Sequence, residues 1–343
     1  MIKRIERMLK DFYLDKIGPI KPLEIFHTIF QFLPYPYPDN VTFEVTNSCN
    51  LSCIMCPYSY MKRKRGFMNF GLYKKIIEQI RNKARYINLY STGEPFLHPK
   101  LYDMIKYAKS KGFTVGTSTN ATLLNEKNSK LLLLSGLDDL QVSIEGSDKK
   151  EYEKIRKGAN FEKVRENLKR LIALRGKNKN PIIDINLLLH KNTDIKKFVE
   201  TWKDYCDMIH VSPMQPIMLF NKKTNAMNSI QPKGIELYEL SKRAIGCPRP
   251  FNNMVISYDG KAGLCCGDFD FDLVMGNAKK EKLIEIFNNK AYKQIRRNFL
   301  FKKFNKTCCK GCPSLYHIQN KNLIYKSQIL VNKLMKSKKN GKE

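Results

Sequence analysis

Short apolar segments alternate with amphipathic segments between residues 40 and 211, and this alternation constrains the fold more than any other feature of the chain. We predict six strands, at 41–46, 86–90, 114–118, 139–144, 182–189 and 208–211. Helices are expected between them at 71–83, 100–111, 126–134, 161–174 and 194–205. Strands and helices in this order predict a parallel sheet with crossover helices. The expected α/β fold is an open or partial (β/α)6 barrel, with its active site at the carboxyl ends of the strands.

The alternation stops near residue 213, which divides the chain into five predicted parts. We expect a basic helical extension at 1–39, the barrel core at 40–213, a linker at 214–245, a small C-terminal domain at 246–316 and a basic tail at 317–343. In the C-terminal domain, Asp259-Gly260 separates two apolar segments and suits a type I′ turn, so a hairpin is expected there. A helix over 282–299 follows.

The composition limits the partners and the location of the chain. The chain has 343 residues and no apolar run of 18, so no membrane span is expected; its charged N-terminus does not resemble a signal peptide, which favours the cytoplasm. The net charge of +30 favours anionic partners, or reflects lysines spread over the whole surface. Basic amphipathic stretches at 2–12 and 323–338 either make peripheral contact with a membrane or pack on the barrel. Nucleic acid is not expected, since no RNA-binding module accompanies the core.

Ten cysteines in a reducing compartment point to metal rather than disulfides, because nine of them fall in two regions. Cys49, Cys53 and Cys56 have the spacing C-x3-C-x2-C, directly after the first predicted strand. Three thiolates on one short loop leave one iron of a four-iron cluster open, where a small chelating molecule can bind. The alternative is a zinc site completed by a distant residue.

The spacing of these cysteines resembles the signature of the radical SAM superfamily, and four further motifs of the chain resemble that family. Three of them follow successive strands: Ser91-Thr92-Gly93-Glu94-Pro95 (similar to GGEP, with Thr92 in place of the first glycine), Thr119-Asn120, and Ser143 to Glu145. The fourth is Arg156, in the segment after Glu145. The resemblance implies a [4Fe-4S] cluster whose open iron is chelated by S-adenosylmethionine. Reduction of that sulfonium releases methionine and a 5′-deoxyadenosyl radical, which abstracts hydrogen from unactivated carbon.

The resemblance also implies which residues contact S-adenosylmethionine. The turn Gly93, Glu94 and Pro95 is expected to bind the methionine amino group, and Asn120 to lie near the cofactor. Ser143 and Glu145 are expected to contact the methionine carboxylate or the ribose. Arg156, expected at the start of a helix, is suited to pair with the carboxylate.

The second cysteine region resembles the twitch domain, the shorter relative of the SPASM domain. Cys247 and Cys265 flank Gly260 in a C-x12-G-x4-C arrangement, and Cys309 and Cys312 follow as C-x2-C. We predict that these four thiolates hold one auxiliary [4Fe-4S] cluster, with zinc as the rival metal. Cys266 and Cys308 are the alternates for their neighbours, and Cys206 is expected to be a buried thiol.

A fully ligated auxiliary cluster suits electron transfer, so the leading hypothesis is oxidation or another radical change of a small, carbohydrate-like or polyol substrate. The alternatives are a peptide maturase, an enzyme modifying RNA or lipid, and a non-enzymatic metal or electron-transfer protein. Flavodoxin or ferredoxin is the expected reductant. No catalytic base can be assigned, although Asp184, Asn186 and His190 could reach the barrel interior. Residues 63–65 either meet an anionic substrate or a flavodoxin, or form a solvated loop.

Overall fold

The computed structural model describes residues 36–189, 193–213, 247, 249–300, 309 and 327–335. These residues form a nine-stranded sheet in the order β6-β5-β4-β3-β2-β1-β7-β8-β9. Its strands are β1 Asn40–Phe43, β2 Tyr86–Asn88, β3 Thr114–Thr119, β4 Asp139–Ile144, β5 Ile182–Leu189, β6 Met208–Pro213, β7 Asn253–Ile256, β8 Lys261–Gly263 and β9 Gly276–Asn277. Pairing is parallel from β6 to β7 and antiparallel from β7 to β9. The predicted α/β class is confirmed.

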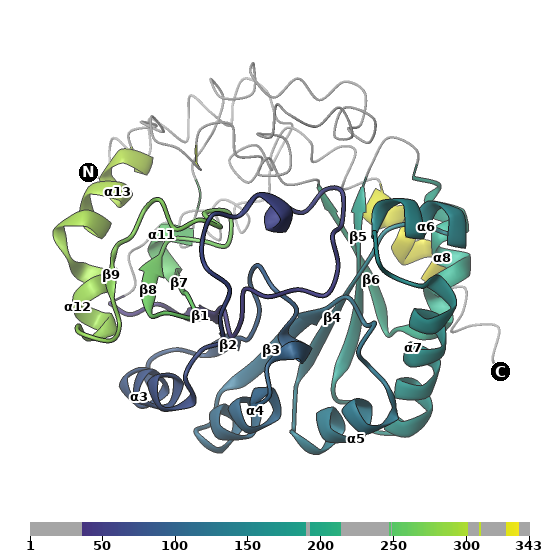
Figure 1. The fold of residues 1–343 in the computed structure, drawn as a ribbon, viewed down its shortest axis with the longest axis horizontal. Helices are drawn as coiled ribbons and strands as arrows, with labels where there is room; N and C mark the ends of the chain where they lie inside the picture. Colours follow the sequence, from purple (N-terminus) through teal and green to yellow (C-terminus); the bar gives the residue numbers. More distant parts are fainter. Residues whose placement is uncertain are drawn as a thin grey trace.

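Helices cover the outer face of the curved sheet, as Figure 1 shows. They are α3 Phe70–Ile80, α4 Leu101–Ser110, α5 Glu126–Leu134, α6 Lys149–Ile155, α7 Phe161–Arg175 and α8 Ile195–Trp202, which is followed by the short helix η3 Lys203–Tyr205. Five begin after an Asn or Asp whose side chain accepts a backbone N–H of the first turn: Asn69, Asn125, Asp148, Asn160 and Asp194. The sequence prediction missed α6, because seven mostly charged residues carry little apolar periodicity.

The pleat of the strands separates an apolar outer face from a polar inner face. In β4, Leu140, Val142 and Ile144 are buried among the helices, while Asp139, Gln141 and Ser143 are only partly buried. The same alternation runs along β5 from Ile183 to Leu187. Because neighbouring side chains of a strand point to opposite faces, the polar set lines the concave side of the sheet.

The C-terminal hairpin extends the core sheet, since β7 pairs with β1 in parallel. Its turn is not type I′, as we had predicted from Asp259-Gly260. That turn requires positive φ at both residues, and only Gly260 has it, at 88°. The predicted helix 282–299 is broken into α12 Leu283–Asn288 and α13 Lys290–Leu300, because the Asn289 side chain accepts the N–H of Tyr292 and starts a new helix.

Residues 327–335 form a helix that packs on the barrel, one of the two alternatives for this basic segment. Val331 is fully buried in the main core. The Gln328 amide accepts the N–H of Val211 and donates to the C=O of Ile209, which closes the edge of β6. The other basic segment, 2–12, lies outside the described residues. In the described part of the chain no helix combines the length and apolar character needed to cross a membrane.

Candidate active site

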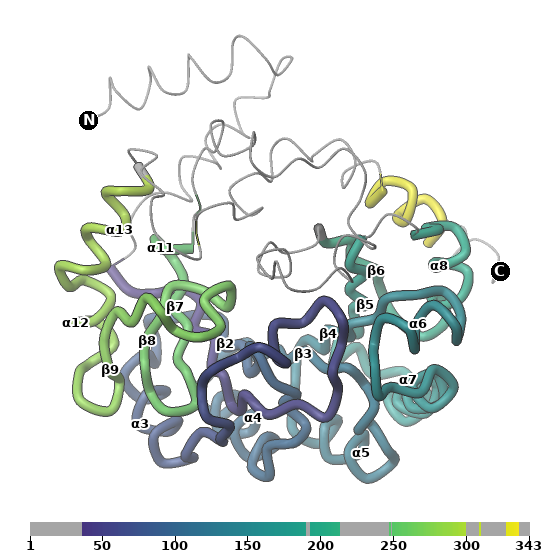
Figure 2. Tube along the Cα trace, turned by 45° about the horizontal axis from the view of Figure 1, so that its top comes forward, coloured from purple at the N-terminus to yellow at the C-terminus, as the bar shows by residue number. Residues whose placement is uncertain are grey.

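The loop after β1 carries the first three cysteines across the mouth of the sheet, between the β7–β9 hairpin and α6 (Figures 1 and 2). Backbone bonds from Ser52 to Lys157 and from Ile54 to Ile155 fix this loop against the end of α6. The three thiols belong to one apolar cluster of side chains, together with Leu51, Ile54, Met55, Ile155, Ala159 and Leu188. The loop therefore gathers Cys49, Cys53 and Cys56 at the carboxyl end of the sheet, as predicted.

Burial among these apolar side chains disfavours thiolates unless a cation replaces their protons. Burial raises the pKa of Cys49 to about 11 and that of Cys53 to about 12, and it raises the pKa of Cys56 as well. Each thiol also lies within the electrostatic reach of another. Metal binding to such thiols must release protons at neutral pH. Among the described residues no three acidic, histidine or cysteine side chains are arranged to hold a single metal ion.

The turn after β2 packs directly on the cysteine loop. The Glu94 N–H donates to the Ser48 carbonyl at 2.8 Å. A Cβ atom on Gly93 would lie 2.5 Å from the carbonyl oxygens of both Thr46 and Ser48, so only glycine allows this approach. The hydroxyl of Thr92, where the resembled motif has glycine, is buried without a hydrogen-bond partner in the described chain. The turn thus offers a polar atom to a ligand beside the thiols.

Glu94 ties this turn to the end of β3. Its carboxylate accepts the Thr119 hydroxyl and the Asn120 N–H, each at 2.8 Å, and the Phe96 N–H at 3.2 Å. Burial raises the pKa of Glu94 to about 7, although these three donors lower it. Asn120 in turn donates from its amide to Asn50 on the cysteine loop at 3.0 Å. Glu94 and Asn120, both predicted to contact the cofactor, therefore also connect the turn after β2, the end of β3 and the cysteine loop.

Glu145 and Arg156 form a buried ion pair with 2.5 Å between Arg156 Nε and Glu145 Oε2. Arg156 Nη1 lies 4.0 Å from Cys53 Sγ. Burial alone would lower the pKa of Arg156, but the charges of Glu145 and Cys53 raise it above its usual range. Arg156 follows the end of α6, so its predicted place at a helix start is wrong. Ser143 faces Ser118, with 3.4 Å between their hydroxyl oxygens.

The second cysteine region gathers around one arginine. Arg249 Nη1 donates to Cys266 Sγ at 3.3 Å, and the charges of Cys266, Cys265 and Cys247 raise the pKa of Arg249 despite its burial. Cys309 is described, whereas Cys308 and Cys312 lie outside the described residues. The ligand set Cys247, Cys265, Cys309 and Cys312 therefore stays a prediction.

Arg63 has a different environment from the one its charge run predicted. It forms a two-pronged ion pair with Glu44, at 2.7 and 2.5 Å, in which the side chains are 8% and 0% exposed. Its Nε donates to the Phe269 carbonyl at 2.7 Å, and its guanidinium lies over the Phe271 ring. Glu44, an acidic residue within the apolar segment 41–46, was a signal that some cation lies nearby, but not of which one. Arg63 thereby connects the cysteine loop to the segment that follows Cys265 and Cys266.

Sequence reasoning also missed two inner hydroxyls, Ser118 and Ser212. The Ser212 hydroxyl donates to Asn186 Oδ1 at 2.6 Å. Below them, Asp184 Oδ1 is buried without a hydrogen-bond partner in the described chain, and burial raises the pKa of Asp184. Alternation along the predicted strand 114–118 was the signal for Ser118, whereas Ser212 lies one residue beyond the predicted strand 208–211. His190 lies outside the described residues.

Two family descriptions match this chain, one over the barrel core and one over the second cysteine region. Residues 43–204 match the radical SAM superfamily, and residues 247–313 match the iron–sulfur cluster-binding domain known as SPASM. The chain contains a radical SAM domain followed by a SPASM domain. These two domains imply [4Fe-4S] clusters and S-adenosylmethionine. Three thiols in one apolar cluster of side chains, beside the Thr92 hydroxyl and the buried Arg156, fit an iron–sulfur cluster and its chelated cofactor.

Curated relatives of this radical SAM protein match over part of their length. The chain is 35% identical over 104 residues to a Pyrococcus furiosus protein described as the tungsten-containing aldehyde ferredoxin oxidoreductase cofactor-modifying protein, covering 30% of this chain and 29% of that one. It is 30% identical over 125 residues to the mycofactocin maturase MftC of Mycobacterium ulcerans, covering 36% and 34%. The chain thus spans about a third of the length of these relatives.

Two structures share the fold of this radical SAM protein. Streptococcus suis SuiB bound to its precursor peptide SuiA aligns with a TM-score of 0.63 and 15% identity, over 92% of this chain and 81% of that one. BtrN in complex with AdoMet and 2-DOIA aligns with a TM-score of 0.54 and 20% identity, over 80% and 92%.

Proposed function

We propose that this radical SAM protein reductively cleaves S-adenosylmethionine and oxidises, or otherwise transforms, a C–H bond of a small carbohydrate-like or polyol substrate. The observation that carries the substrate class is the inner face of the sheet near its carboxyl end. It presents uncharged groups that both donate and accept, on four neighbouring strands: Ser118, Ser143, Asn186 and Ser212. Beyond the hydrogen bonds within each pair, these hydroxyl and amide groups keep donor and acceptor capacity that matches the hydroxyls of a polyol.

The roles of the chain's own residues follow from their positions. Cys49, Cys53 and Cys56 would hold the first cluster, and the turn at Thr92 to Glu94 with Ser143 and the Arg156–Glu145 pair would hold S-adenosylmethionine. Cys247, Cys265, Cys309 and Cys312 would hold the auxiliary cluster. When bound, the cofactors supply a carbon-centred radical that removes hydrogen and an acceptor for the remaining electron. Asp184, with one buried oxygen free, is placed to accept a hydrogen bond from a substrate hydroxyl.

A peptide maturase is the second candidate function. The 30% identity over 125 residues to mycofactocin maturase MftC favours it. The polar face described above would then contact peptide groups. Modification of RNA or lipid has no such support.

Substrate screening with Asn186→Ala tests the proposal. The measurement is product formation from candidate polyols and precursor peptides, together with 5′-deoxyadenosine released with and without them. We expect a polyol to increase 5′-deoxyadenosine release, and Asn186→Ala to lose product while keeping the substrate-free release. Ser110→Ala, on the outer helix α4, is the matched control and should behave as wild type. Turnover of a peptide alone would refute the polyol assignment, and equal loss of both signals would refute a substrate role for Asn186.

A further inference from the structure

The segment that follows the cysteine loop, residues 57–67, carries four successive cations and no acid; we call it the cationic loop. It carries Lys62, Arg63, Lys64 and Arg65 in succession. No acidic residue occurs anywhere between Glu44 and Glu78. The loop starts as the short helix η1 Pro57–Tyr60, directly after Cys56.

Three of its four cations are free to meet a partner. Arg63 is buried against Glu44, but Lys62, Lys64 and Arg65 are exposed and have no ion pair among the described residues. Some lysines on the outer surface pair with neighbouring acids, as Lys130 does with Glu126, Lys197 with Asp148 and Lys203 with Glu200. The cationic loop differs from other unpaired lysines of the surface in that its cations are consecutive and directly follow the first cysteine motif.

The cationic loop is held in one conformation. The Lys64 carbonyl accepts the Asn47 amide at 2.8 Å and the Tyr258 hydroxyl at 3.0 Å. Arg65 donates to the Tyr58 carbonyl at 2.7 Å, and its guanidinium lies 4.1 Å from the centre of the Tyr58 ring. A solvated loop would lack these anchors. Charges fixed before binding lose less entropy when a partner docks.

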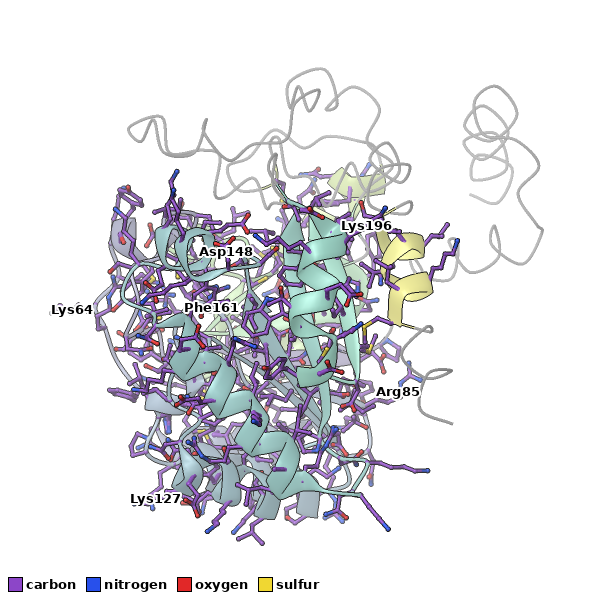
Figure 3. The ribbon with its side chains drawn as sticks, turned by 90° about the vertical axis from the view of Figure 1, so that its right-hand side faces the viewer. Lys64, Arg85, Lys127, Asp148, Phe161 and Lys196 are labelled. Carbon is purple, nitrogen blue, oxygen red and sulfur yellow. The ribbon has the colours of Figure 1, made fainter. Side chains whose placement is uncertain are left out.

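The loop also lies beside the first cluster site. The helix η1 starts one residue after Cys56, and Arg65 donates to the carbonyl of Tyr58, two residues past that thiol. Two large apolar side chains are exposed on the loop, Tyr60 at 46% and Phe67 at 48%. Lys64 lies at the outer edge of the molecule in Figure 3. The surface combines rigid positive charge, aromatic contact area and a short path to the cluster.

We propose that the cationic loop is the docking surface for an acidic one-electron carrier protein of the flavodoxin or ferredoxin class. This inference rests on the proposed function, since reductive cleavage of S-adenosylmethionine requires an electron from outside. Complementary charge speeds the encounter of two proteins by about 10 to 1,000-fold at low salt, and the exposed aromatic side chains supply the contact area of a transient complex.

The test compares a triple variant, Lys62→Gln with Lys64→Gln and Arg65→Gln, with a control that removes three cations from the outer helices. The control is Lys127→Gln with Lys163→Gln and Lys169→Gln, on α5 and α7; Lys127 lies far from Lys64 in Figure 3. The probe is an acidic flavodoxin. Its binding in the oxidised state is followed by flavin fluorescence, and its reduction of the cluster by the loss of visible absorption. Dithionite serves as the small-molecule reductant.

We expect the loop variant to bind flavodoxin, and to accept its electron, at least about tenfold more weakly and more slowly at low salt. This difference should shrink as salt screens the charges, while the control keeps wild-type values. Dithionite should reduce all three proteins equally. The proposal is overturned if the loop variant binds flavodoxin as tightly as wild type does. It is also overturned if the loop binds a short single-stranded RNA and not flavodoxin. Failure of the proposed function gives a different result. In that case the protein reduced with dithionite releases no 5′-deoxyadenosine, although the loop variant still binds flavodoxin more weakly than wild type.

Discussion

Replacing Arg63 by Met should destabilise the protein more than the loss of any exposed ion pair. The change removes three donors and leaves the fully buried Glu44 carboxylate with one remaining backbone donor, the Tyr258 N–H at 3.3 Å. Breaking a buried ion pair from one side costs about 3–5 kcal/mol. Because Arg63 also holds the Phe269 carbonyl, the variant should loosen the contact between the two cysteine regions.

Urea unfolding of the metal-free protein, followed by circular dichroism, measures this loss. Arg85→Met is the matched control, since its pair with Asp39 joins a side chain that is 76% exposed and should be worth at most about 1 kcal/mol. Adding Glu44→Leu to Arg63→Met should recover much of the stability, because no buried charge then remains. A loss below about 1 kcal/mol in Arg63→Met, or no recovery in the double variant, would refute the reasoning.

Two further predictions concern the turn after β2. The folded chain holds the Glu94 proton more tightly than the unfolded chain, with a pKa of about 7 against 4.5. Stability should therefore fall by about 3 kcal/mol as pH rises from below 4.5 to above 7, and Glu94→Gln should lack this component in unfolding measured across that range. Gly93→Ala should displace the cysteine loop and lower the iron content after reconstitution. Gly71→Ala, whose Cβ meets only the Asn69 side chain at 3.0 Å, should retain its iron; equal iron in both variants would contradict the steric argument.

Long apolar strands were predictable from the sequence. The predicted strands 139–144 and 182–189 match β4 and β5 at both ends. In each, apolar buried residues alternate with polar residues that face the inner side of the sheet, and this pattern defines the strand. The predicted first strand runs three residues too far, because the chain leaves β1 after Phe43 and bridges to Phe67 through Thr46. The carboxyl-end placement of the motifs followed from the same strand pattern.

Contacts between distant segments were not predictable. The pairing of β7 with β1 joins residues more than 200 positions apart, and no local pattern encodes that choice. The Glu44–Arg63 pair was missed for a related reason. A charge run in sequence looks the same whether each cation faces water or a buried carboxylate.

Counting iron and sulfide tests the central claim most directly, namely that the chain holds two four-iron clusters. The protein is reconstituted without oxygen, as wild type and as Cys49→Ala with Cys53→Ala and Cys56→Ala, with Cys206→Ala as the control for a buried thiol outside both regions. We predict roughly eight irons in wild type and in the control, and about four in the triple variant. About four irons in wild type and none in the triple variant would contradict the auxiliary cluster and remove the electron acceptor on which the proposed oxidation depends.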